Sequence, residues 1–364
     1  MLTARIFWLK THLYLGLFAG AVLALLGLTG SALVFGEQID RFLNPDIAVH
    51  VAPGVFPGGI AETVERHYGY KPYYVEAAGG GAYKAFFELP GGGDEARAVF
   101  VDPAGNRILG SELWGSYFSS FMRELHEDLF LGEIGDYVVG AIGIFAIVSI
   151  LTGLYLWWPR VGALRKAFLY RRSRHPLVIN FEIHRLAGFY LAVVLFAISL
   201  AGIYLVFPQA FTSVVGTVST ATHWPETVQS RPAEPGAQPL SLDDVRRVLE
   251  ARAPGAVATG YQIPQTGEEA YAVYFRDPAE PYSRFGLSTL WVDQYTGEVL
   301  LANEYVRAVP GDRFISNQYL LHNGEILGLP GQWLVFFTGL LIPAMYGTGV
   351  YLWWARRRRA PRST

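Results

Sequence analysis

Residues 13–35 read LYLGLFAGAVLALLGLTGSALVF and include no Asp, Glu, Lys or Arg. Because a helix needs about 20 apolar residues to cross a bilayer, this run predicts a transmembrane helix. The run is longer than the apolar core of a signal peptide, which has about 7–15 residues, so we expect the helix to be retained. Three more uncharged runs of this kind follow at 137–158, 186–207 and 330–354.

Basic residues gather beside the ends of these runs. Arg5 and Lys10 precede the first run, seven Lys and Arg residues lie in 159–185, and five arginines follow residue 355. Since Lys and Arg are enriched in cytoplasmic segments, both termini and the connector are predicted to be cytoplasmic, and the long segments 36–136 and 208–329 to lie outside. The net charge of −2 gives no sign of nucleic-acid binding.

The order of elements repeats along the chain: a helix, an outer domain, a second helix and a basic segment, then the same again. Both halves run in one direction, which predicts a parallel repeat. Spacings agree between the halves. Gly30 follows His12 at the spacing at which Gly202 follows His184, and Gly153 and Trp157 follow His126 at the spacings at which Gly349 and Trp353 follow His322.

The predicted fold class is therefore an α-helical membrane protein with four transmembrane helices in two parallel repeats and two periplasmic α+β domains. Each outer domain is expected as a helix packed on a small antiparallel sheet, and Ser241 and Asp244 predict a cap at one helix start. The expected boundaries are 1–36 (first helix), 37–118 (outer domain), 119–158 (interfacial segment and second helix), 159–183 (connector), 184–208 (third helix), 209–315 (linker and outer domain), 316–355 (interfacial segment and fourth helix) and 356–364 (basic tail).

Four histidines stand near the ends of the apolar runs. His12 and His184 each open a run, and His126 and His322 each lie in a Leu-His pair before one. Paired imidazoles at the ends of packed membrane helices are suited to be the two axial ligands of a haem iron. An ordinary interfacial role is the alternative for each histidine taken alone.

Topology predicts how these ligands pair. Two histidines on opposite sides of a core about 30 Å thick cannot share one iron, so His12 is paired with His184 near the cytoplasmic face, and His126 with His322 near the outer face. Pairing within each half remains possible if helices tilt or re-enter. The chain has no cysteine, which excludes covalent CxxCH attachment, so the predicted cofactor is two non-covalent haem b groups.

The second ring nitrogen of a ligating histidine usually donates a hydrogen bond. Several polar side chains near His126 and His184 are candidates to accept this bond or to pair with a bound haem. For each of them, an ordinary role at the membrane interface is the alternative. The acceptor candidates are Asn180, Glu182, Glu127 and Asp128, and the candidates to pair with haem propionates are Arg123 and Arg185.

Several motifs occur in order and in duplicate, and through them the chain resembles the PepSY-associated transmembrane family over nearly its full length. That family includes bacterial inner-membrane ferric-siderophore reductases with two b-type haems. The resemblance implies PepSY-like outer domains, an inner-membrane location and an oxidoreductase acting on a ferric siderophore. The motifs are LHEDLFLG (125–132) and LHNGEILGLPG (321–331), GLYLWW (153–158) and GVYLWW (349–354), FVDPAGNRILG (100–110) and WVDQYTGEVLL (291–301), with the helix starts at His12 and His184.

No GxGxxG motif at a helix start and no Walker motif occurs, so a nucleotide or flavin site is not expected. The electron donor is then a cytoplasmic reductase or a membrane quinol. The aromatic residues of 114–121 are expected either to line a site for a bulky chelate or to pack the domain onto the membrane helices. Two alternatives remain: a non-enzymatic membrane sensor or scaffold that binds a peptide or protein, and a cytochrome b quinol oxidoreductase with another acceptor.

Overall fold

The computed structural model describes residues 2–45, 58–78, 82–89, 96–102, 104, 107–159, 163–225, 227–281 and 283–359. The chain divides into two compact units. The membrane unit comprises Met1–Val34, Met122–Phe211 and Gln318–Thr364, and the sheet unit comprises Phe35–Phe121 and Thr212–Asn317. His50, Arg160, Arg362 and most of the predicted turn at 103–106 lie outside the described residues.

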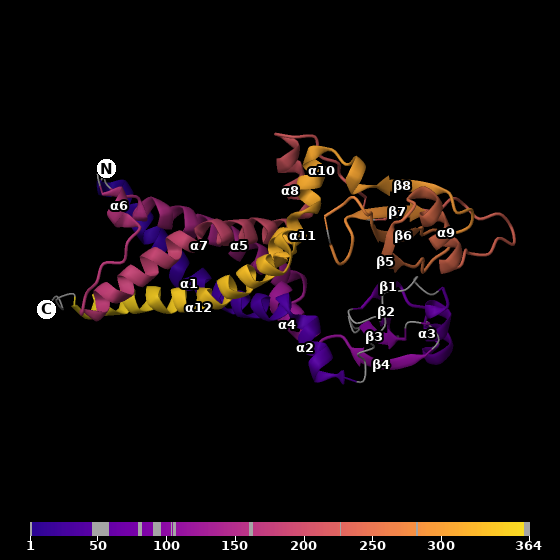
Figure 1. Cartoon of the computed structure of the whole chain (residues 1–364), viewed down its shortest axis with the longest axis horizontal. Coiled ribbons are helices and arrows are strands. Elements are labelled where there is room, and N and C mark those ends of the chain that lie inside the picture. The colour runs from indigo at the N-terminus through magenta and orange to yellow at the C-terminus, as the bar shows by residue number, and fades with distance from the viewer. Residues whose placement is uncertain are drawn as a thin grey trace. The chain divides into compact units, whose positions relative to one another are not determined.

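Four long helices form the membrane unit, and each is long and apolar enough to cross a membrane. They run side by side in Figure 1. The chain is thus a membrane protein, as its four uncharged runs predict. The helices are α1 (Leu2–Val34), α5 (Glu133–Trp157), α7 (Pro176–Val206) and α12 (Gly328–Arg359).

The third helix begins inside the segment that the sequence predicts as connector. Pro176 occupies the first turn of α7, and the His175 side chain accepts a hydrogen bond from the backbone N–H of Leu177. Proline suits this position because its missing N–H has no partner there in any helix. The local cap therefore sets the start of α7, whereas the uncharged run marks only its membrane-embedded part.

The bundle has a defined order of neighbours. Helix α1 packs against α12 and α5, and α7 packs against α5 and α12, so α1 and α7 are diagonal to each other. Between α1 and α12, Ser31 Oγ donates to the carbonyl of Phe336 at 2.8 Å. A Cβ on Gly27 would lie only 2.8 Å from the carbonyl oxygen of Gly339, so glycine is required for this close approach of two backbones.

Short helices precede the second and fourth long helices. Helix α4 (Phe118–Glu127) comes before α5, and α11 (Gln318–Asn323) with the 3-10 turn η3 (Glu325–Leu327) comes before α12. The turn after α4 is strained: Leu129 and Phe130 both have φ of 57°, a region that costs residues other than glycine roughly 1–2 kcal/mol. α6 (Leu164–Ala167) lies in the connector.

The sheet unit is one eight-stranded antiparallel sheet in the order β4-β3-β2-β1-β5-β6-β7-β8. Strands β1–β4 come from the first outer segment and β5–β8 from the second. The strands are β1 (Tyr74–Ala77), β2 (Tyr83–Glu88), β3 (Ala96–Val101), β4 (Ile108–Leu113), β5 (Val257–Gln262), β6 (Tyr271–Arg276), β7 (Ser288–Val292) and β8 (Val299–Asn303).

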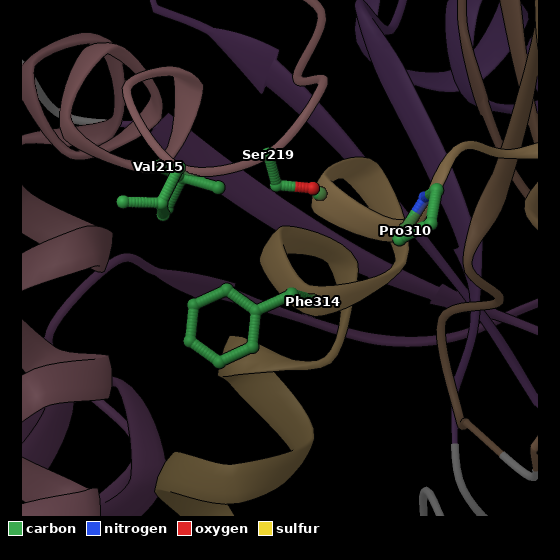
Figure 2. A pocket seen from close by; sticks show the side chains of 6 residues that line it. Val215, Ser219, Pro310 and Phe314 are labelled. Carbon is green, nitrogen blue, oxygen red and sulfur yellow. The ribbon is translucent and has the colours of Figure 1, made fainter.

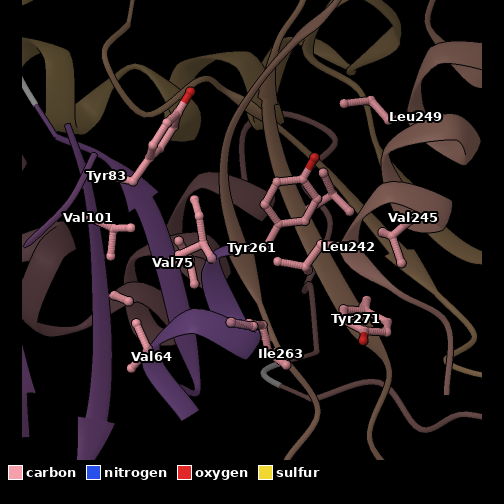
Figure 3. Close-up of a cluster of buried hydrophobic side chains, with 14 of the residues drawn as sticks. Val64, Val75, Tyr83, Val101, Leu242, Val245, Leu249, Tyr261, Ile263 and Tyr271 are labelled. Atoms are coloured by element: carbon pink, nitrogen blue, oxygen red, sulfur yellow. The ribbon is translucent and has the colours of Figure 1, made fainter. Parts of the chain in front are cut away.

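The two outer segments share one hydrophobic core. Each contributes the predicted helix, α3 (Ile60–Tyr68) and α9 (Leu242–Arg252), and the capping box of Ser241 and Asp244 is confirmed at the start of α9. Antiparallel pairing of β1 with β5 joins the two four-stranded halves. Figure 3 shows side chains of both halves, among them Val64 and Leu249, in one cluster.

The remaining helices are short. α2 (Gly36–Leu43) follows α1, α8 (Pro208–Gly216) follows α7, and η2 (Tyr305–Arg307) and α10 (Pro310–Ser316) follow β8. The buried carboxylate of Asp312 in α10 accepts hydrogen bonds from the backbone N–H and the hydroxyl of Thr222. This contact fixes α10 against the chain that follows α8.

Candidate functional site

The first histidine pair joins diagonal helices at one end of the bundle. His12 lies in α1 and His184 in α7, and their ring centroids are 6.2 Å apart with an interplanar angle of 75°. Both side chains are half-buried. Residues from the two halves of the chain are thus brought next to each other, as the predicted topology requires.

The second pair lies at the other end of the same bundle. His126 in α4 and His322 in α11 have ring centroids 6.0 Å apart and an interplanar angle of 61°. His126 contacts Gly30 of α1, the helix that carries His12 near its start. At about 1.5 Å per helical residue, the stretch from His12 to Gly30 separates the two pairs by about 27 Å along α1.

The spacing within each pair fits two imidazoles that share one iron. If two imidazoles each bound one iron through a nitrogen at about 2 Å, their ring centroids would lie roughly 6.4 Å apart. The observed 6.2 Å and 6.0 Å lie close to that separation. The residues present therefore fit a haem with two axial histidines at each end of the bundle, and the structure does not bring together the alternative pairs within each half.

Each histidine is anchored through Nδ1 to a neighbouring helix. No described residue hydrogen-bonds the Nε2 atom of any of the four. This arrangement orients the ring and leaves the other nitrogen for a ligand. Nδ1 of His12 lies 3.0 Å from the carbonyl of Ser149, that of His126 2.9 Å from Thr29 Oγ1, that of His184 2.8 Å from Thr348 Oγ1, and that of His322 3.0 Å from the carbonyl of Ile198.

The histidines of the second pair favour the form that binds metal. Burial lowers the pKa of His126 to about 3, and the nearby His322 contributes to this lowering. Burial also lowers the pKa of His322. Both imidazoles are therefore neutral near pH 7, which is the ligating form.

In the described part of the chain, none of the four candidate acceptors bonds a histidine ring, which leaves for each the alternative of an ordinary interfacial role. Asn180 donates to the carbonyl of Thr348 at 2.8 Å, and Asp128 accepts from the backbone N–H of Phe130. Glu127 pairs with Arg123 at 3.0 Å, and Glu182 pairs with Arg185 at 2.6 Å. Sequence neighbours lie on the same helix as the histidine, whereas each Nδ1 faces the next helix, so proximity in sequence was a misleading guide.

The residues that do bond Nδ1 carry a signal in the sequence that could have found them. Thr152 follows His126 at the spacing at which Thr348 follows His322. Thr152 Oγ1 lies beside Nδ1 of His12, and Thr348 Oγ1 lies beside Nδ1 of His184. Thr348 Oγ1 donates to the carbonyl of Met345 at 2.7 Å, so it accepts the Nδ1 proton of His184. Thr29, which is 3 % exposed, has the same role for His126.

Two residues of the aromatic stretch 114–121 pack on rings of the sheet unit itself, a contact that neither of the two predicted roles describes. The ring centroid of Trp114 lies 6.0 Å from that of Phe86, and Tyr117 stacks on Phe100 at 5.6 Å. Three of these rings surround the Nζ atom of Lys84, which pairs with the buried Glu112 at 2.9 Å. Burial raises the pKa of Glu112 to about 7.

A separate apolar pocket lies in the sheet unit. It has a volume of about 270 Å³ and is lined by Val215, Val218, Ser219, Pro310, Gly311 and Phe314. Figure 2 shows Val215 of α8 and Phe314 of α10 on two of its sides. No lining side chain is titratable, so this pocket offers no acid, base or metal ligand.

The described part of the chain contains no group of three or more His, Asp or Glu side chains placed to hold a metal ion, and the histidine pairs are two-residue sites. A comparison with curated proteins finds no match. The family model described as the PepSY-associated TM region matches residues 9–356, which confirms the resemblance predicted from the duplicated motifs. The chain belongs to the PepSY-associated transmembrane family.

Proposed function

We propose that this protein is a di-haem b reductase of the bacterial inner membrane that passes electrons outward to a periplasmic ferric siderophore and releases Fe(II). The observation that carries the proposal is the pair of histidine contacts, at 6.2 Å and 6.0 Å, at the two ends of one bundle. Two pairs about 27 Å apart suit a relay that spans a core about 30 Å thick.

The proposed orientation rests on the basic residues at one end of the bundle. His12 lies near Lys10, and α12 ends in Arg356–Arg359 beyond Gly349, which faces His184. Positive residues are retained on the cytoplasmic side, so the pair of His12 and His184 is proposed to face the cytoplasm. The pair of His126 and His322 then faces the periplasm, together with both outer segments.

The contacts of the histidines also support a parallel repeat. In both halves, the histidine of the first helix contacts a Gly of a second helix, at Gly153 or Gly349. The histidine of the short helix contacts a Gly of a first helix, at Gly30 or Gly202. A rotation that exchanges α1 with α7 and α5 with α12 would reproduce this pattern, as expected for an axis along the membrane normal.

Haem b bound at each pair would supply a one-electron iron couple, whose potential depends on the axial ligands and their hydrogen bonds. The protein orients the four rings by keeping each Nδ1 hydrogen-bonded to a neighbouring helix. Reduction of ferric to ferrous iron adds one electron and weakens binding by hard oxygen ligands, so the siderophore can release the metal. No proton transfer is required, and the donor is a cytoplasmic reductase or a membrane quinol.

An absorption spectrum separates this function from a non-enzymatic sensor or scaffold. The full-length protein, purified in detergent, is expected to show the reduced-minus-oxidised bands of haem b and two haems per chain. Dithionite-reduced protein is then mixed with a ferric siderophore and a chromogenic Fe(II) chelator. Haem-free protein would refute the proposal; haem oxidised by a quinone but not by the siderophore would favour a quinol oxidoreductase with another acceptor.

A further inference from the structure

Each histidine ring rests on a glycine of the neighbouring helix. A Cβ built on that glycine would lie closest to Cε1 of the ring. The distance from this Cβ to Cε1 is 2.9 Å for Gly30 against His126, 3.1 Å for Gly202 against His322, 3.1 Å for Gly153 against His12, and 3.5 Å for Gly349 against His184.

The glycine faces Cε1 of the ring, and the hydrogen bond is made by the adjacent atom, Nδ1. In all four cases the helix that supplies the glycine also bonds Nδ1. For example, α1 supplies Gly30 against Cε1 of His126 and Thr29 Oγ1 against its Nδ1. A ring tethered in this way cannot move away from a larger residue without losing its bond.

We infer that Gly30, Gly202 and Gly153 are positioning residues for His126, His322 and His12 respectively. Each permits the ring to approach the neighbouring helix closely enough to bond Nδ1, and so directs the remaining nitrogen toward the partner histidine. This inference rests on the proposed function, and it adds that the neighbouring helix, as well as the histidine's own helix, determines the ligand geometry.

The four distances predict a graded effect of alanine. Carbon atoms in contact are optimally about 3.5–4.0 Å apart, so Gly30→Ala at 2.9 Å must displace its ring, whereas Gly349→Ala at 3.5 Å fits without movement. Gly202→Ala and Gly153→Ala, both at 3.1 Å, are intermediate. Gly16 in α1 and Gly347 in α12 have no atom within 4 Å of an added Cβ and are matched controls in the same helices.

The experiment measures haem content and the electron paramagnetic resonance g values of the oxidised full-length protein for each variant. Gly30→Ala is expected to weaken outer-haem retention by about tenfold, the lower end of the effect of losing an orienting partner, and to shift only that haem's g values. Gly153→Ala should weaken inner-haem retention by less than Gly30→Ala weakens that of the outer haem. Gly349→Ala, Gly16→Ala and Gly347→Ala should match the wild type.

Two results would overturn the inference. One is a wild type with two haems in which Gly30→Ala has the spectrum of Gly16→Ala; the proposed function would then stand without the positioning role. The other is an equal loss of haem in Gly30→Ala and Gly349→Ala, which the graded distances exclude. A wild type without haem would instead refute the proposed function itself, so the two failures are distinguishable.

Discussion

At the scale of single residues, the four histidines are expected to divide into two pairs by the haem that they retain. His12→Ala and His184→Ala should remove the haem at one end, because each leaves one axial position without a nitrogen ligand. His126→Ala and His322→Ala should remove the other. Haem per chain falls from two to one in every case, and the g values identify which remains. Loss of the same haem in His12→Ala and His126→Ala would show that the pairing is wrong.

The hydroxyl of Thr348 provides a second test at this scale. Thr348→Val keeps the shape of the side chain but removes the acceptor 2.8 Å from Nδ1 of His184. Loss of such a partner typically costs about 10–100-fold in metal affinity, so inner-haem retention should fall while the outer haem is unchanged.

Thr338 in the same helix is the matched control for that variant. It is 2 % exposed, and its Oγ1 has no hydrogen-bond partner among the described residues. Thr338→Val should therefore leave both haems in place and cost no stability, since it removes an unpaired buried hydroxyl. Equal haem loss in the two variants would assign the effect to helix packing.

At the scale of elements, the ion pair between β2 and β4 should make the sheet sensitive to pH. Burial raises the pKa of Glu112 to about 7, above its value in the unfolded chain. Between these two values the unfolded state loses a proton that the folded state keeps, so stability falls as pH rises from about 5 to 7. The fall is at most about 3 kcal/mol, at about 1.4 kcal/mol per pKa unit.

Urea unfolding of the full-length protein at pH 5 and pH 7.5, followed by tryptophan fluorescence, measures this effect. The urea midpoint should be higher at pH 5. Glu112→Gln keeps a polar partner for Lys84 and cannot ionise, so its midpoint should change less between the two pH values. A wild type that is more stable at pH 7.5 would contradict the assigned pKa shift.

Because the outer segments share one core, a destabilising substitution in one half should also destabilise the strands of the other half. Leu249 of α9 is 2 % exposed within the common cluster, and Leu→Ala in such a core costs about 2–5 kcal/mol. Leu249→Ala should increase hydrogen exchange in β2 as well as in β6. Val257→Ala, at a residue 45 % exposed in β5, is the control. Increased exchange confined to β5–β8 would mean that the halves unfold separately.

At the scale of the whole molecule, the proposed orientation can be tested because the chain has no cysteine. Glu268→Cys introduces one exposed thiol in the second outer segment, and Lys166→Cys introduces one in the connector. A membrane-impermeant maleimide should label Glu268→Cys in intact spheroplasts and Lys166→Cys only after permeabilisation. The opposite pattern would reverse the direction of the proposed electron transfer.

The sequence was sufficient to predict the four candidate membrane spans and the family. Uncharged runs such as 13–35 report directly on the bilayer, because charged side chains are costly in the hydrocarbon core, and such a run must be helical because its peptide groups can be bonded only within the segment. The helix in each outer segment and the cap at Ser241 also depend on local residues. These features depend on residues that are close in sequence, so the periodicity and composition of the sequence predict them.

Tertiary packing alone decided what surrounds the histidines and how the outer segments join. The Nδ1 partners, such as Thr348 and Ser149, lie on other helices, and the adjacent glutamates proposed from the sequence bond arginines instead. Pairing of β1 with β5 likewise joins segments that a transmembrane helix pair separates in the chain. Alternation along a strand predicts which face is buried but not which edge it pairs with, because that choice depends on where the whole chain places the edges.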